Sequence, residues 1–202
     1  MVARLTAADG YSSQRDYSIA SAPAGGPDRD RVELTVQLTE GGEVSGYLAG
    51  VAEPGDQFDL RGPIGGWFVW HSDDTRPLLL VAGGSGIVPL MAMLRTHDQV
   101  NSEVPVRLVY SARTPADVIY TTELSERSRV SPLALSYSFT RAAPDGVKTG
   151  RINAATLADA AFSPRAAPAI FVCGPAGFVE AATSLLVAAG HDFAGIRTER
   201  FG

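Results

Sequence analysis

Residues 77–94, PLLLVAGGSGIVPLMAML, decide the fold of this chain. The run from Leu78 to Ala82 is entirely apolar, which is typical of a central parallel strand buried on both faces. A glycine-rich turn follows at 83–86, and Pro89 suits the first turn of a helix, where its missing N–H donor is not needed. Such a loop before a helix N-terminus can bind an anion, for instance the pyrophosphate of a dinucleotide. Because the spacing is not G-x-G-x-x-G, this stretch alone leaves a phosphate cradle and a structural turn equally open.

The composition of the chain limits its class. With 202 residues, 45% of them hydrophobic, it has room for one large or two small domains. Lys and Arg number 17 against 22 Asp and Glu, and no basic block stands out, which argues against nucleic acid as a partner. No apolar run is long enough to span a membrane, and no signal peptide opens the chain. We therefore expect no membrane span and a cytoplasmic protein.

The single cysteine, Cys173, sets a second limit. One cysteine can form neither a disulfide within the chain nor an all-cysteine iron–sulfur site. We expect no metal site, and any electron carrier that contains a cluster must be a separate protein. The sequence leaves a monomer and a dimer open.

Residues 1–72 have the pattern of a small antiparallel β-domain. Glycine- and proline-rich turns separate short runs of alternating apolar and polar residues. Strands are expected at 2–7, 15–21, 32–38 and 57–62, and a short helix at 44–51. Few short strands with little helix between them indicate a small antiparallel barrel.

Residues 73–202 alternate between strand and helix. Strands are expected at 77–82, 105–110, 134–139, 169–173 and 195–201, and helices at 88–97, 118–128, 154–161 and 176–189. Asn153 is placed to cap the third of these helices, and Gly190 to end the fourth. Four alternations closed by a strand predict a doubly wound parallel sheet, and the polar segment 71–76 marks the boundary between the two domains.

Ligands of an open parallel sheet bind beyond the carboxyl ends of its strands. Arg113 and Arg141 follow two expected strands, and guanidinium groups there suit a phosphate, although each alone could equally be a solvated loop residue. Cys173 lies at another strand end, just before a helix. No histidine is placed as its partner, so the sequence does not support a nucleophilic role.

Four motifs occur in a fixed order along the chain: RDYS at 15–18, GPIGGWF at 62–68, VAGGSGIVP at 81–89 and CGPAG at 173–177. With the tail at 199–201, they resemble the ferredoxin–NADP reductase superfamily, and in particular the flavin-dependent reductase components of oxygenases. The resemblance runs from about Leu5 to Gly202. It implies an N-terminal antiparallel Greek-key β-barrel that binds FAD, followed by a doubly wound α/β domain that binds NADP, with NAD as the alternative.

The resemblance also implies an activity and the residues of the flavin site. The enzyme would take a hydride from NAD(P)H onto FAD and pass electrons to a separate carrier such as a ferredoxin or an oxygenase component. Arg15 would hold the flavin diphosphate, Tyr17 would stack on the isoalloxazine ring and Ser18 would hydrogen-bond flavin N5. Val44 and Ser45 would form a second diphosphate clamp, which points to FAD rather than FMN. Without the resemblance, Arg15 and Tyr17 would be read as barrel surface.

For the nicotinamide nucleotide, the resemblance assigns the pyrophosphate turn to Gly83, Gly84, Ser85, Gly86 and Ile87. Five more residues belong to the candidate nucleotide site because they lie at the ends of expected strands: Ser111, Arg113, Arg141, Gly174 and Pro175. Cys173 would lie beside the nicotinamide ring, and Ser18, Cys173, Glu199 and Phe201 would be the catalytic residues. Phe201 would cover the flavin face that nicotinamide must reach, and so act as a gate. The two arginines favour NADPH, while the nearby Asp117 keeps NADH open.

The barrel is short for this family. We count about four strands, fewer than the family's Greek-key barrel has, and little chain precedes the RDYS motif. Three explanations are open: a late start or fragment, strands supplied by another subunit, or a degraded flavin site. The third would make the chain a non-enzymatic NAD(P)-binding module, or an interaction subunit that pairs through its open barrel edge.

Overall fold

The computed structural model describes residues 1–201 except 8, 24–29 and 132, and it divides the chain into two units, Met1–Gly66 and Trp67–Gly202. The division falls a few residues before the boundary expected at 72. Residues 67–70 belong to the second unit because they pack on it: the Phe68 ring meets Phe171 edge to face at 5.4 Å, and Arg197 Nη1 donates to the Val69 carbonyl at 2.6 Å.

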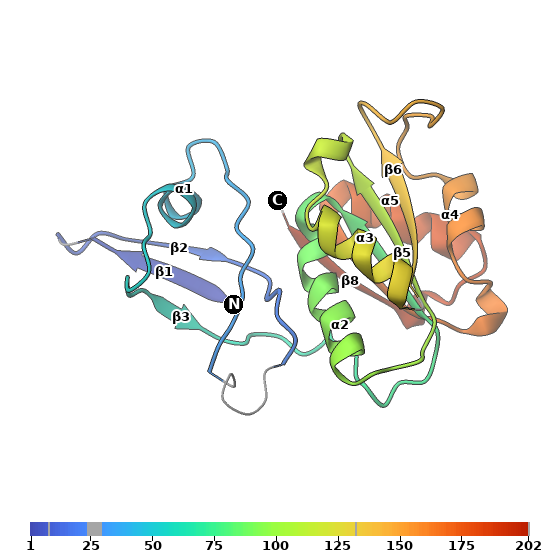
Figure 1. The fold of residues 1–202 in the computed structure, drawn as a ribbon, viewed down its shortest axis with the longest axis horizontal. Coiled ribbons are helices and arrows are strands. Elements are labelled where there is room, and N and C mark those ends of the chain that lie inside the picture. The colour runs from blue at the N-terminus through green and yellow to red at the C-terminus, as the bar shows by residue number, and fades with distance from the viewer. Residues whose placement is uncertain (8, 24–29, 132, 202) are drawn as a thin grey trace. The chain divides into compact units, whose positions relative to one another are not determined.

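The first unit contains a three-stranded antiparallel sheet with one short helix (Figure 1). The strand order is β2-β1-β3, formed by β1 (Val2–Thr6), β2 (Ser12–Asp16) and β3 (Asp59–Arg61). Helix α1 (Glu43–Gly50) occupies the region expected to be helical. The antiparallel sheet confirms the expected class of the N-terminal domain, and the described residues form three strands where about four were expected.

Two expected strands of this unit were wrong in extent. The strand expected at 15–21 begins earlier, as β2, and ends at Asp16. The strand expected at 32–38 is reduced, among the described residues, to one bridge between Ile19 and Leu34. An alternating segment forms a strand only where a partner strand pairs with it and a core buries its apolar side chains. Here the side chains of Val32 and Leu38 remain 42% and 66% exposed. The glycine- and proline-rich turn at 24–29 lies outside the described residues.

The second unit is a five-stranded parallel sheet, as expected. Its order is β6-β5-β4-β7-β8. The strands are β4 (Leu78–Gly83), β5 (Val106–Ala112), β6 (Leu133–Phe139), β7 (Ala169–Pro175) and β8 (Ile196–Phe201). Every residue of β4 is buried, as its apolar sequence predicts. The direction of winding reverses between β4 and β7, and such a switch point is where open α/β sheets bind ligands.

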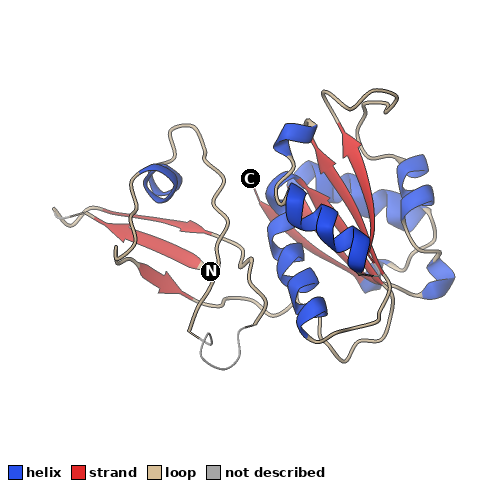
Figure 2. Ribbon diagram, viewed as in Figure 1, coloured by secondary structure: helices blue, strands red, loops and turns tan. Residues whose placement is uncertain are grey.

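Helices cover both faces of this sheet (Figure 2). One face carries α2 (Ile87–Gln99) and α3 (Thr121–Val130), and the other carries α4 (Ala154–Ala160) and α5 (Ala176–Ala188). Short 3₁₀ turns lie at Gly84–Gly86, Pro115–Asp117, Pro164–Ala166 and Phe193–Gly195. The expected cap of α4 is present, since the Asn153 side chain accepts the Thr156 N–H at 3.1 Å. Gly190 follows α5 at a φ of +98°, the left-handed stop that was expected.

The apolar core lies along the sheet. Leu79, Val81 and Val172 belong to a buried cluster with Leu157 of α4 and Leu186 of α5. Burial of each such side chain stabilises the fold by about 1.5–3 kcal/mol. This core holds the ends of β4 and β7 in place and thereby supports the edge at which the parallel strands end. Among the described residues, no helix combines the length and the apolar character that crossing a membrane requires.

Candidate nucleotide and flavin sites

The carboxyl ends of the parallel strands meet at one edge of the second unit. In the register of the sheet, Gly83 lies beside Ser111, and Cys173 lies between Ala82 and Glu199. Phe201, at the end of β8, pairs with Pro175 and is 38% exposed. The structure therefore brings together the sequence segments 83–86, 111–113, 173–175 and 199–201, which are far apart along the chain.

The glycine turn after β4 packs directly against the backbone of β7. A Cβ atom on Gly86 would lie 2.2 Å from the carbonyl oxygen of Cys173, so no other residue fits there without moving β7. Gly84 has a φ of +55°, a conformation that favours glycine. Among the described side chains, none caps this turn or the start of α2. A close, glycine-rich turn at a helix N-terminus fits an anion, and a pyrophosphate in particular.

Phe178 of α5 is a residue of this edge that sequence reasoning missed. Its ring occupies the space that a Cβ atom on Gly83 or on Gly174 would need, at 2.6 and 2.8 Å respectively. The available signal was indirect: each of two buried strands carries a glycine at or next to its last residue, which indicates that another group packs closely against the backbone there.

Cys173 has the environment of a neutral thiol. Its side chain is fully buried, and burial raises the pKa of the thiol far above its ordinary value. The carboxylate of Glu199 raises this pKa further, while the Gly174 N–H lowers it. A thiol held in its protonated form presents an uncharged surface at the strand end and is a poor nucleophile, in line with the sequence argument.

Arg113 and Arg141 lie on neighbouring loops. The Arg141 backbone N–H donates to the Arg113 carbonyl at 2.8 Å, and both residues are exposed. Asp117 is the residue that left NADH possible as the hydride donor. It is engaged within its own loop, because its carboxylate accepts a hydrogen bond from the Thr114 hydroxyl at 2.6 Å. Two exposed guanidinium groups on adjacent strand-end loops fit a second phosphate.

The candidate flavin residues Arg15 and Tyr17 lie at the end of β2. The Tyr17 N–H donates to the Met1 carbonyl at 2.8 Å, and the Met1 ammonium donates to the Tyr17 carbonyl, also at 2.8 Å. Burial raises the pKa of the Tyr17 phenol, and the positive charge of Arg15 lowers it, as expected when the guanidinium lies near the ring. Arg15 Nη1 donates to the Gln14 carbonyl at 2.7 Å, and the side chain is exposed. A cation and an aromatic ring near each other suit a phosphorylated, planar cofactor.

The N-terminus of α1 holds Val44 and Ser45, both buried. The Ser45 hydroxyl accepts the Thr39 N–H at 3.3 Å and donates to the Gly42 carbonyl at 3.4 Å, so it is engaged within the protein. Among the described side chains none caps this helix, and the first-turn backbone N–H groups are the donors that it offers. This turn therefore fits a diphosphate through its backbone, whereas the Ser45 hydroxyl shapes the turn.

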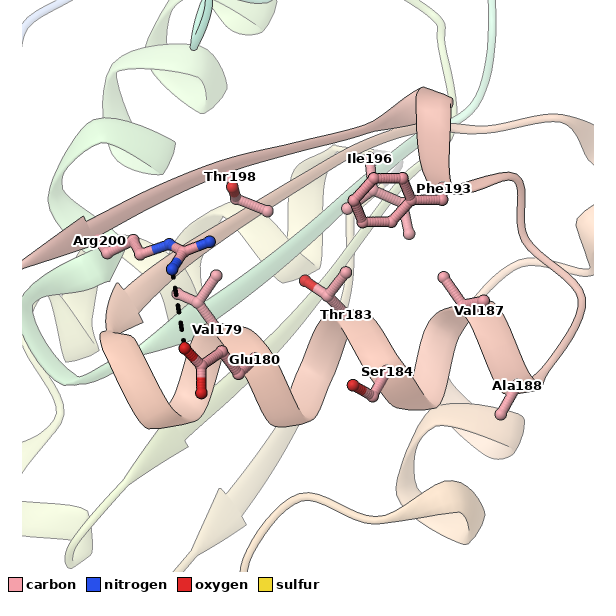
Figure 3. A pocket seen from close by; sticks show the side chains of 10 residues that line it. All are labelled: Val179, Glu180, Thr183, Ser184, Val187, Ala188, Phe193, Ile196, Thr198 and Arg200. Atoms are coloured by element: carbon pink, nitrogen blue, oxygen red, sulfur yellow. Dashed lines mark ion pairs between the residues drawn. The ribbon is translucent and has the colours of Figure 1, made fainter.

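A hollow of about 550 Å³ lies elsewhere, between α5 and the edge strand β8 (Figure 3). Val179, Thr183 and Val187 line it from α5, with Ile196 and Thr198 from β8. The Thr183 hydroxyl is buried and, within the described part of the chain, has no hydrogen-bond partner. The hollow lies mainly along the length of α5 and β8, so we do not assign it to the nucleotide.

Comparison with known proteins agrees with a candidate flavin site in the first unit and a candidate nucleotide site in the second. A family model described as the oxidoreductase FAD-binding domain matches residues 1–69, and one described as the oxidoreductase NAD-binding domain matches residues 80–184. The reductase component of propane 2-monooxygenase from Mycolicibacterium smegmatis is 29% identical over 88% of this chain and 51% of its own length. The electron transfer component of toluate 1,2-dioxygenase from Pseudomonas putida is 30% identical over 95% of this chain and 55% of its own length.

A solved structure shows the same fold. The FAD/NAD-binding domain of a nitric oxide dioxygenase from Vibrio cholerae superposes with a TM-score of 0.85 at 25% identity, covering 100% of this chain and 83% of that one. The chain spans about half the length of the two reductase components named above. Since the two domain models match in order and the second alone covers half of the chain, the chain belongs to the ferredoxin–NADP reductase superfamily of oxidoreductases, with an FAD-binding domain followed by an NAD-binding domain.

Proposed function

We propose that this protein is a flavoprotein reductase that takes a hydride from NAD(P)H onto FAD and passes electrons to a separate acceptor, such as a ferredoxin or an oxygenase component. The observation that carries the proposal is the glycine turn seated on the Cys173 carbonyl, in a chain whose other domain matches the FAD-binding model. FAD supplies the chemistry that joins a two-electron donor to a one-electron acceptor.

The strand-end edge of the second unit would bind and orient the nicotinamide nucleotide. The turn at 83–86 would receive the pyrophosphate at the start of α2. The neutral thiol of Cys173 would form an uncharged wall beside the nicotinamide ring, and Glu199, its neighbour in the sheet, would place a carboxylate next to it. Gly174 and Pro175 continue this wall toward α5. Fixed orientation of the donor is the main contribution that a protein makes to hydride transfer.

In the first unit, Arg15 and the N–H groups of Val44 and Ser45 would hold the flavin diphosphate. The half-buried ring of Tyr17 would stack on the isoalloxazine, and Ser18 would hydrogen-bond its N5 atom. Phe201 would act as a gate that moves aside when nicotinamide enters. These assignments rest on residue identity and on local geometry within each unit.

We infer that NADPH is preferred to NADH. The support is the pair of exposed arginines, Arg113 and Arg141, on adjacent loops, together with the engagement of Asp117 by Thr114. A carboxylate that already accepts a hydrogen bond within its loop is less available to a ribose 2′-hydroxyl. Because the reaction consumes NAD(P)H and the lone cysteine needs no oxidising surroundings, we also propose the cytoplasm as its compartment.

The acceptor would be a separate protein, since the chain has one cysteine and the relatives named above are reductase or electron transfer components of multicomponent oxygenases. A steady-state diaphorase assay with an artificial one-electron acceptor, run with NADPH and NADH and with and without added FAD, tests the proposal. FAD-dependent turnover of NADPH is expected. Nucleotide binding without turnover at saturating FAD would contradict it and would support a binding module instead.

A further inference from the structure

Phe178 lies across the two strand ends that form the nucleotide edge. Three of its ring atoms, Cδ1, Cγ and Cε1, lie 2.6, 2.7 and 3.0 Å from the position that a Cβ atom on Gly83 would take. Its Cδ1 atom lies 2.8 Å from the corresponding position on Gly174. These two glycines also approach each other, because a Cβ atom on Gly174 would lie 3.1 Å from both the Cα atom and the carbonyl oxygen of Gly83. One ring therefore contacts the backbone at the ends of both β4 and β7.

The contact differs from ordinary core packing. A core aromatic residue packs against side chains, whereas Phe178 reaches the strands where both positions lack a side chain. The ring is only partly buried, and it packs against the apolar cluster that α5 forms with the sheet. It thus joins a rigid core to the two strand ends from which the pyrophosphate turn and the Cys173 wall begin.

We propose that Phe178 is a positioning residue for the nicotinamide nucleotide. This inference rests on the proposed function. The ring would set the separation between the turn at 83–86 and the end of β7, and thereby the distance between the pyrophosphate donors and the wall beside the nicotinamide. Phe178 would act through these backbones.

The two close glycines of the edge offer a matched comparison. Gly83 and Gly86 both have ordinary backbone angles, with φ of −117° and −61°, so alanine is conformationally allowed at each. At Gly83 the obstacle to a Cβ atom is the Phe178 side chain, whereas at Gly86 it is the backbone of Cys173 and Gly174. Removing the ring should therefore relieve the first clash and leave the second unchanged.

The experiment measures the dissociation constant of NADP⁺ by calorimetric titration on the FAD-loaded chain, with the unfolding midpoint as a check on folding. Phe178→Leu should weaken binding about tenfold, because small displacements of positioning groups have large effects. Phe178→Tyr, which keeps the ring, should bind as the wild type does. Gly83→Ala should weaken binding at least tenfold in the wild-type background and by less than about twofold in the Phe178→Ala background.

Gly86→Ala is the control, and its effect should persist in the Phe178→Ala background. Wild-type affinity in Phe178→Leu, or equal effects of Gly83→Ala in both backgrounds, would overturn the role of Phe178 and leave the proposed function standing. A wild-type chain that binds neither NADP⁺ nor NAD⁺ would overturn the proposed function together with this inference.

Discussion

Gly86 lies so close to Cys173 that a Cβ atom on the glycine would stand 2.2 Å from the cysteine's carbonyl oxygen. The turn after β4 and the end of β7 therefore form one surface, although more than 80 residues separate them in the sequence. A side chain at Gly86 could be accepted only if one of the two backbones moved. The nucleotide edge thus depends on this contact between two strands that meet at the switch point of the sheet.

Gly86→Ala should abolish NADP⁺ binding while FAD remains bound. The added methyl group meets backbone, and overpacking of this kind costs about 1–3 kcal/mol of folding stability. The damage should be confined to the second unit. Flavin content from the visible spectrum and a titration with NADP⁺ measure the two effects separately, and wild-type affinity for NADP⁺ in this variant would refute the assignment of the turn.

Arg113→Ala and Arg141→Ala should each lower kcat/KM for NADPH about tenfold, which corresponds to about 1.4 kcal/mol, and leave NADH almost unchanged. The loss should be selective because NADPH alone carries the 2′-phosphate. Arg165→Ala is the matched control, since Arg165 is an exposed arginine in the turn before β7, at the opposite end of that strand. Equal losses with both nucleotides would argue against a 2′-phosphate site.

The stability of the protein should fall above pH 9.0 in a way that depends on Cys173. Burial raises the pKa of its thiol above the ordinary value of 9.0, so the folded chain keeps a proton that the unfolded chain loses. Below pH 9.0 the thiol is protonated in both states, and its contribution to stability is fully kept. Above pH 9.0 the thiol of the unfolded chain ionises, and the free energy of unfolding falls by up to about 1.4 kcal/mol per pH unit. Denaturant unfolding of the wild type and of Cys173→Ala between pH 8 and 10 measures it.

The comparison of the wild type with Cys173→Ala separates the expected result from a contradicting one. The difference in unfolding free energy between the two proteins should shrink as the pH rises above 9.0, because the variant lacks the group that titrates. A difference that stays constant over this range would mean that the thiol is not held protonated. Rapid alkylation of the native wild type by iodoacetamide at pH 8 would contradict its burial as well.

Phe201→Ala should change nucleotide affinity and the preference between NADPH and NADH. Phe201 ends β8 beside Pro175 and is partly exposed, as a gate requires. Phe193→Ala provides the control, because Phe193 is an exposed phenylalanine in the turn that precedes the same strand. Steady-state kinetics with both nucleotides that match the wild type would rule out the gate.

The parallel sheet was predictable because its signals are local. The apolar run at 78–82, followed by a glycine turn, is typical of a buried strand, and the Asn153 cap and the Gly190 stop mark helix ends by chemistry that needs no distant partner. The convergence of the strand-end segments followed from topology, since parallel strands present their carboxyl ends at one edge.

What could not be predicted depends on distant partners. Residues 32–38 alternate like a strand, yet they form only one bridge, because no second ladder is present to receive them among the described residues. The segment 67–70 joined the second unit through Phe171 and Arg197, which lie at least 100 residues further along the chain. Phe178 belongs to none of the four sequence motifs, and its contact with two strand ends appears only in the folded structure.

The central claim is that this chain transfers a hydride from NAD(P)H to FAD, and anaerobic mixing of the FAD-loaded protein with NADPH tests it most directly. We predict a rapid loss of the visible absorption of the oxidised flavin, close to stoichiometric with bound FAD. NADH should act more slowly. Bound FAD whose absorption stays unchanged while NADPH saturates the nucleotide site would contradict the account.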